Sequence, residues 1–90
     1  MQTYYPYKSD KKDKKYYIIT SSGKKVYFGA TGYQDYTMHH DDARKQSYIR
    51  RHSANENWNN PDTAGFWSRW LLWNKKTIDE SYKDIRKMLR

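Results

Sequence analysis

Lysines interleaved with tyrosines dominate the start of the sequence, and they suit an anionic partner. The first 30 residues hold seven lysines and only two aspartates. Lysine and arginine neutralise phosphates and release counterions, while an exposed aromatic ring can stack on a base. This pattern favours a nucleic-acid interface, although charge runs also occur on ordinary solvated faces. The candidate binding residues here are Lys11, Lys12, Lys14, Lys15, Lys24, Lys25 and Tyr27, with Tyr16 and Tyr33 nearby.

A second set of cations lies in the segment RKQSYIRRH. Guanidinium groups match the oxygens of a phosphate geometrically, so we predict that Arg44, Arg50 and Arg51 contact a nucleic-acid backbone. The alternative is that Arg51 pairs inside the domain with Asp41, Asp42 or Glu56. Lys75 and Lys76 complete the predicted binding set. This hypothesis requires that the cations gather into one surface after folding.

Imidazoles and carboxylates of the kind found in hydrolytic metal sites occur between residues 39 and 60. They are His39, His40, Asp41, Asp42, His52, Glu56 and Asn60. Adjacent histidines on a helix point about 100° apart, and neither has a partner imidazole four residues away. His52 and Glu56 are better explained as an ordinary i, i+4 contact. We therefore predict no catalytic residue, no metal and no cofactor.

Tryptophans concentrate in the segment TAGFWSRWLLWN. Three of the four tryptophans and one of the two phenylalanines occur there, with Arg69 among them. Rings recurring at spacings of three and four favour a buried central helix. A surplus of exposed rings would instead form a patch for a protein partner. The second possibility supports an alternative function, that of a virion structural or adaptor protein with a Trp-rich docking surface.

The N-terminal half must position the first set of cations. Residues 1–15 are strongly charged in their second half, so we expect a flexible basic arm followed by a single domain over residues 16–90. The run KKYYIITSSGKKVYFGA predicts a β-hairpin that turns at Gly23. Strand alternation places Tyr17 and Ile19 opposite Phe28 and Val26. A short third strand is expected over residues 33–36.

The C-terminal half is predicted to be helical. Thr37 is the expected N-cap of a helix that starts near Met38 and stops by Asn55. Thr63 should cap a second helix over residues 64–73. Thr77, with Glu80 three residues later, forms the sequence pattern of a capping box for a third helix. The fold class is therefore α+β, with a two- or three-stranded antiparallel hairpin sheet packed on about three helices.

Composition limits the remaining possibilities. Ninety residues provide one core, and the formal net charge of +8 favours an anionic partner. The absence of cysteine excludes disulfides and suits a reducing compartment. No apolar run is long enough to span a membrane, and the first residues lack the apolar core of a signal peptide. We expect an intracellular protein that is not secreted and does not bind membranes.

Three of these segments carry a family resemblance. The hairpin and turn sequence FGATGYQDYT, the helix RKQSYIRRH and the segment TAGFWSRWLLWN resemble a small uncharacterised family of giant nucleocytoplasmic large DNA viruses. The resemblance spans residues 23–81 and implies a viral protein in the virion or in the host cytoplasm or nucleus. Combined with the charge pattern, it predicts a non-enzymatic nucleic-acid-binding accessory protein that favours DNA over RNA. A viral protein partner remains the alternative.

Overall fold

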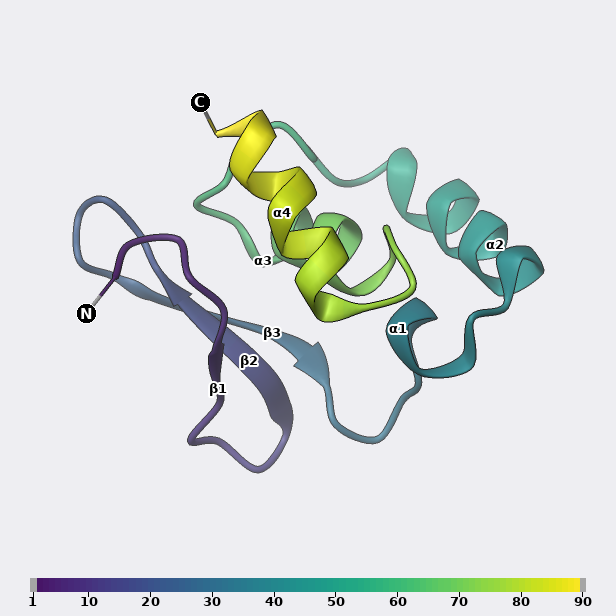
Figure 1. Cartoon of the computed structure of the whole chain (residues 1–90), viewed down its shortest axis with the longest axis horizontal. Coiled ribbons are helices and arrows are strands. Elements are labelled where there is room, and N and C mark those ends of the chain that lie inside the picture. Colours follow the sequence, from purple (N-terminus) through teal and green to yellow (C-terminus); the bar gives the residue numbers. More distant parts are fainter. Residues whose placement is uncertain (1, 90) are drawn as a thin grey trace.

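A three-stranded antiparallel sheet forms the N-terminal part of the computed structural model, which describes residues 2–89 (Figure 1). Its strands are β1 (Tyr7–Lys8), β2 (Lys14–Ile19) and β3 (Lys25–Ala30), in that spatial order. Helices follow as α1 (Tyr36–His39), α2 (Asp42–Ser53), α3 (Ala64–Trp67) and α4 (Ile78–Met88). Helix α3 continues directly into a π-helical segment, η1 (Ser68–Leu72). The predicted α+β class, with an antiparallel hairpin sheet on helices, is confirmed.

The N-terminal segment belongs to the sheet, which corrects the expected flexible arm and the expected domain start at residue 16. Strand β1 pairs with β2, and Lys14 already lies within β2. The Tyr4 amide donates to the carbonyl of Ile19 at 2.9 Å, and the Tyr4 ring packs 6.4 Å from that of Trp67. The Tyr4 hydroxyl also donates to Asp62. Burial and pairing of the tyrosines thus outweigh the charge of the lysine run that follows them.

The register of the hairpin differs by one residue from the predicted pairing. Ile18 pairs with Val26, and Tyr17 pairs with Tyr27. The reason lies in the turn, where the Thr20 amide donates to the Lys24 carbonyl at 2.9 Å and the Lys24 amide donates to Thr20 Oγ1 at 3.2 Å. These bonds close a loop of three residues that ends on Gly23 at φ 87°. A one-residue shift exchanges the two faces of the strand.

The segment after β3 also differs from the prediction. Residues 33–36 form no third strand, because α1 begins at Tyr36 with Asp35 as its N-cap. His40 then adopts a left-handed conformation at φ 54° and ends α1. Helix α2 starts afresh with the Asp41 side chain accepting from the amides of Ala43 and Arg44. The expected single helix capped by Thr37 is therefore two helices, each capped by an aspartate.

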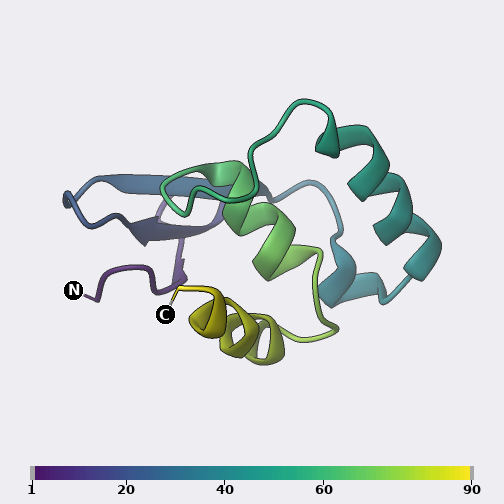
Figure 2. The same ribbon diagram turned by 90° about the horizontal axis from the view of Figure 1, so that it is seen from above.

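The core lies between the inner face of the sheet and the helix formed by α3 and η1 (Figure 2). Thr63 caps this helix as predicted, accepting from the Phe66 amide at 3.2 Å. Trp67 is fully buried and contacts Phe28, with ring centroids 6.0 Å apart. Loss of such a buried ring typically costs about 3–5 kcal/mol. The remaining buried members of the cluster are Ile18, Phe66, Leu71, Leu72 and Ile85.

Helix α4 covers the other side of η1, as Figures 1 and 2 show together. Thr77 caps it by accepting from the Glu80 amide at 3.1 Å, which confirms the predicted N-terminus. The apolar residues of α4 face the core, with Ile85 fully buried and Tyr82 partly so. Within residues 2–89, no helix combines the length and apolar character that crossing a bilayer requires.

Candidate nucleic-acid interface

An open groove runs between β3, the loop of residues 31–35, helix α2 and the helix formed by α3 and η1. Its main part has a volume of about 620 Å³, and an adjoining hollow has about 360 Å³. The two parts share Tyr33, Gln34, Arg51 and Trp73 in their walls. We call the combined feature the α2–β3 groove. Pockets of this size commonly hold small molecules or single residues of a polymer.

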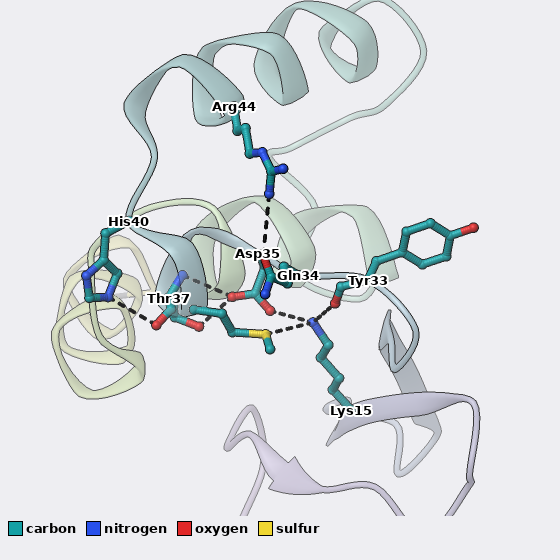
Figure 3. A network of polar contacts seen from close by, with 8 residues as sticks. Lys15, Tyr33, Gln34, Asp35, Thr37, His40 and Arg44 are labelled. Carbon is teal, nitrogen blue, oxygen red and sulfur yellow. Dashed lines mark hydrogen bonds and ion pairs between the residues drawn. The ribbon is translucent and has the colours of Figure 1, made fainter.

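One wall of the groove is the 31–35 loop, which a buried ion pair holds in place (Figure 3). Lys15 Nζ lies 2.7 Å from Asp35 Oδ2 and donates to the Tyr33 carbonyl at 2.6 Å. Asp35 is only 3% exposed and also accepts from the Thr37 amide at 3.0 Å. Because each charge has several partners, the pair fixes the loop backbone. Lys15, predicted to bind phosphate, is therefore occupied by a structural contact.

The ring of Tyr33 points away from this network in Figure 3, and 74% of the residue is exposed. Lys15 holds the backbone of Tyr33 in place, so the ring lies at the edge of the groove on a fixed stretch of backbone. Exposed rings on fixed backbones are suitable for stacking on an unpaired base. Sequence reasoning named Tyr33 as a residue near the predicted binding set. It did not identify Gln34 or Trp73, whose positions depend on the tertiary fold.

Four of the predicted cations line the groove, namely Lys14, Lys15, Arg44 and Arg51, and so does Tyr27. Arg44 lies 3.9 Å from Asp41 and directs its Nη1 to Gln34 Oε1 at 3.4 Å. The Arg51 Nε donates only to the Ser47 carbonyl, at 3.4 Å. Within residues 2–89, no carboxylate lies within 4.0 Å of the Arg51 guanidinium. The alternative that Arg51 pairs with a carboxylate inside the domain is thus not observed, and both arginines are exposed.

The other predicted cations lie elsewhere, so the expectation that all the cations gather into one surface is wrong, and only the groove-lining subset lies together. Lys24 and Lys25 lie at the hairpin turn, on the opposite side of the molecule from α2 (Figure 1). The maximum extent of the fold is 35 Å. Arg50 is not a lining residue of the groove, although its Nη2 lies 3.4 Å from Ser47 Oγ in the wall of the adjoining hollow. The exposed residues Lys12, Lys75 and Lys76 are also outside the groove lining, as is Lys11.

The outer face of the sheet carries a row of tyrosines, but their ring faces are covered. Tyr17 stacks on Tyr7 at 5.5 Å and lies 5.4 Å from Tyr27. The ammonium of Lys11 sits 4.2 Å from the Tyr27 centroid, and Lys25 sits 4.8 Å from that of Tyr17. The Tyr27 hydroxyl donates to Asp10 at 2.7 Å, which raises the pKa of Tyr27 to about 12. These rings stabilise the sheet and leave little open surface for stacking.

Stacked rings form the inner wall of the groove beside α2. Tyr48 lies between Trp73, at 4.5 Å, and His52, at 4.3 Å. Burial raises the pKa of the Tyr48 hydroxyl, which favours its neutral form. Glu56 accepts from His52 Nδ1 and from Trp58 Nε1, so the predicted contact between His52 and Glu56 is confirmed. This wall is rigid and mostly aromatic.

The imidazoles and carboxylates considered for a metal site have other partners. His39 Nδ1 accepts from the Asp41 amide at 2.9 Å, and Asp41 caps α2. The Tyr36 hydroxyl donates to Asp42 at 2.6 Å. Across residues 2–89, no three His, Asp or Glu side chains are grouped so that they could hold a metal ion. The groove therefore offers cations, rings and two carboxylates, of which Asp35 is held in the ion pair with Lys15 and Glu56 is left for recognition.

The tryptophans do not provide the docking surface that the alternative function requires. Trp67 is fully buried, and Trp58, Trp70 and Trp73 are half-buried. The Arg69 guanidinium lies 4.2 Å from the Trp70 ring and 5.4 Å from that of Trp58. Arg69 also donates to the Trp73 carbonyl at 2.7 Å. The surplus rings thus pack around an arginine within the domain.

Residues 7–52 match the model of a family described as a family of unknown function, DUF5754. The matched span contains the sheet, α1 and nearly all of α2, and so includes Lys14, Arg44 and Arg51. No curated protein and no solved structure matches the chain. The family description states neither an activity nor a source, so the viral origin suggested by the sequence stays a prediction.

Proposed function

We propose that this chain, which belongs to the family of unknown function DUF5754, binds an unpaired nucleic-acid strand in the α2–β3 groove. The observation that carries the proposal is the composition of the groove. Lys14, Arg44 and Arg51 line it, and the 74% exposed ring of Tyr33 stands at its edge. Cations that follow a groove, together with exposed rings, are the two components of single-strand recognition.

The two components serve different parts of the strand. Lys14 and Arg51 lie in the walls of the main groove, and Arg44 lies in the adjoining hollow, so phosphates of successive nucleotides can be neutralised along its length. Tyr33 supplies a ring face for a base, a contact typically worth about 1–3 kcal/mol. An intact duplex keeps its base faces stacked on one another. An unpaired strand uses both components of the groove and is therefore the preferred ligand.

The biological setting that we propose follows from the sequence resemblance. The protein acts as a non-enzymatic accessory protein of a large DNA virus and works in the virion or in the host cytoplasm or nucleus. Its strand is DNA in preference to RNA. Parallel measurements with deoxy and ribo oligonucleotides of the same sequence test that preference, and equal or tighter binding of the ribo form would contradict it.

A salt series with matched arginine variants tests the binding function. Each phosphate contact on a single strand contributes about 0.7 to the slope of log K against log salt, so three contacts give a slope of about −2. Fluorescence anisotropy with a labelled oligothymidine of about 12 nucleotides measures this slope. Arg51→Gln should weaken binding and reduce the slope by about 0.7.

Arg50→Gln is the control, because Arg50 is the neighbour of Arg51 on α2 but lies outside the groove lining. It removes the same charge and should leave binding almost unchanged. Tyr33→Ala should weaken binding without altering the slope, since stacking releases no counterions. Binding that is absent at low salt, or equal losses in Arg50→Gln and Arg51→Gln, would contradict the proposed function.

A further inference from the structure

Glu56 is a carboxylate within the cationic groove, and phosphate binding does not explain it. Its side chain is 23% exposed, and it lines the main part of the groove together with Arg51 and His52. A carboxylate repels a phosphate, so the strand must place another group beside it. Carboxylates accept hydrogen bonds and donate none when ionised. The group next to Glu56 must therefore carry N–H or O–H donors.

Three neighbours hold the Glu56 carboxylate in one position. His52 Nδ1 bonds to Oε2, and Trp58 Nε1 donates to Oε1 at 3.3 Å. On the third side lies Gly65, where a Cβ atom would come within 2.6 Å of Oε1. The carboxylate thus rests against the first turn of α3, in a place that only glycine leaves open. An acceptor fixed in this way is preorganised for a specific partner.

The carboxylate keeps capacity for additional hydrogen bonds. An ionised carboxylate offers about four lone-pair sites, and His52 and Trp58 use two of them. About two acceptor sites are left for a ligand in the groove. A partner with two adjacent N–H donors matches this arrangement best, because it forms a bidentate pair with one carboxylate.

Among the nucleic-acid bases, guanine presents that pair of donors. Its N1–H and its 2-amino group lie side by side on the Watson–Crick edge. Adenine and cytosine each place an amino donor beside a ring acceptor, which a carboxylate repels. Thymine and uracil offer one N–H between two carbonyl oxygens. A single carboxylate therefore discriminates in favour of guanine when the edge is unpaired.

We propose that the α2–β3 groove selects an unpaired guanine, with Glu56 accepting from its N1–H and 2-amino group. This inference rests on the proposed function, since Arg51 and Lys14 hold the adjoining phosphates and Tyr33 contacts the base face. The guanine can belong to a strand or to a free guanine nucleotide. The same edge is recognised in both cases, and the experiment below separates the two sources.

Binding of oligothymidines of about 12 nucleotides that carry one central guanine, hypoxanthine, adenine or thymine tests the selection. The guanine oligomer should bind about ten-fold more tightly than the all-thymine oligomer. Hypoxanthine keeps the N1–H but lacks the 2-amino group, so it should lose most of that gain. This comparison changes only the ligand and does not depend on how a variant folds.

Two protein variants connect the preference to Glu56. Glu56→Gln should abolish the ten-fold guanine preference, because an NH2 donor group replaces one of the two adjacent acceptor oxygens. Asp79→Asn makes the same charge change on α4, outside the groove, and should retain the preference. Circular dichroism and thermal unfolding of each variant confirm that it is folded.

The outcomes separate this inference from the function on which it rests. Equal binding of the four oligomers would overturn guanine selection and leave strand binding intact. Failure of every oligomer to bind would overturn the proposed function itself. Guanosine monophosphate that binds as tightly as the guanine oligomer would identify a free nucleotide as the source. Much weaker binding of the mononucleotide would identify the strand.

Discussion

At the scale of single residues, three glycines differ in whether an added side chain would meet backbone strain, steric contact, both or neither. Gly29 has φ +79°, and a Cβ there would lie 2.8 Å from Leu72 Cδ1. Gly23 has φ +87° with nothing within 4 Å of that position, and Gly32 has open space as well. The positive φ at Gly23 and Gly29 disfavours any L side chain. Only Gly29 combines that strain with a crowded site under the core.

We predict a graded effect of substituting each glycine with alanine. Gly32→Ala should change the free energy of unfolding by less than about 0.5 kcal/mol. Gly23→Ala should cost about 1–2 kcal/mol for the left-handed backbone. Gly29→Ala should cost more than Gly23→Ala, by about 1 kcal/mol or more, because Leu72 must also move. Urea denaturation of the three variants measures the order. An equal loss at positions 23 and 29 would show that contact with Leu72 does not matter.

At the scale of secondary-structure elements, local capping signals could be recognised in the sequence, whereas pairing between segments could not. Thr63 and Thr77 cap helices where the sequence predicted them, because a cap depends on residues within one turn. The hairpin register depends on whether Thr20 joins the turn or the strand, and both fit the sequence pattern. Likewise, the sequence did not identify Asp41 as the N-cap of α2, because Thr37 is an equally good N-cap candidate four residues earlier.

The N-terminal strand is the element for which the charge of the sequence led to a wrong prediction of disorder. The lysine run suggested disorder, yet Tyr4 contacts Trp67 and Tyr7 stacks on Tyr17. Deleting residues 2–8 should therefore lower the free energy of unfolding by about 3 kcal/mol or more, since the packed rings of Tyr4, Tyr5 and Tyr7 are lost. Urea unfolding followed by tryptophan fluorescence measures the change.

The matched control for this deletion neutralises charge without removing rings. The double substitution Lys11→Gln and Lys12→Gln lies in the exposed loop after β1 and should change stability by less than about 0.5 kcal/mol. A deletion variant as stable as the full chain would mean that the segment contributes nothing to the domain, as a flexible arm would.

At the scale of the whole molecule, the sequence indicated which residue types occur in the groove but not which individual residues line it. The residue types followed from charge and aromatic content, and the fold brings Lys14, Arg44 and Arg51 of the predicted set into one concave feature. Lys15 could not be separated from Lys14, because its role depends on contact with Asp35, twenty residues away. Glu56 took part in a local contact with His52, but its exposure in the groove depends on Gly65 of α3.

The net charge of +8 has a consequence for the stability of the whole fold. Within residues 2–89, only Lys15 and Arg44 among the lysines and arginines lie within 4.0 Å of a carboxylate. Repulsion among the remaining cations destabilises the compact state, and added salt screens it. Raising NaCl from about 20 mM to about 300 mM should therefore increase the melting temperature, by about 4–8 °C if about 1 kcal/mol is recovered.

Differential scanning calorimetry across the same salt series used for binding measures this shift. The two effects have opposite signs, because salt weakens the contacts of Lys14, Arg44 and Arg51 with phosphate but strengthens the fold. Loss of binding at high salt thus cannot come from unfolding of the protein. Sodium chloride and choline chloride should act alike if screening is the cause. A melting temperature that falls with salt would mean that attractive ion pairs outweigh the repulsion.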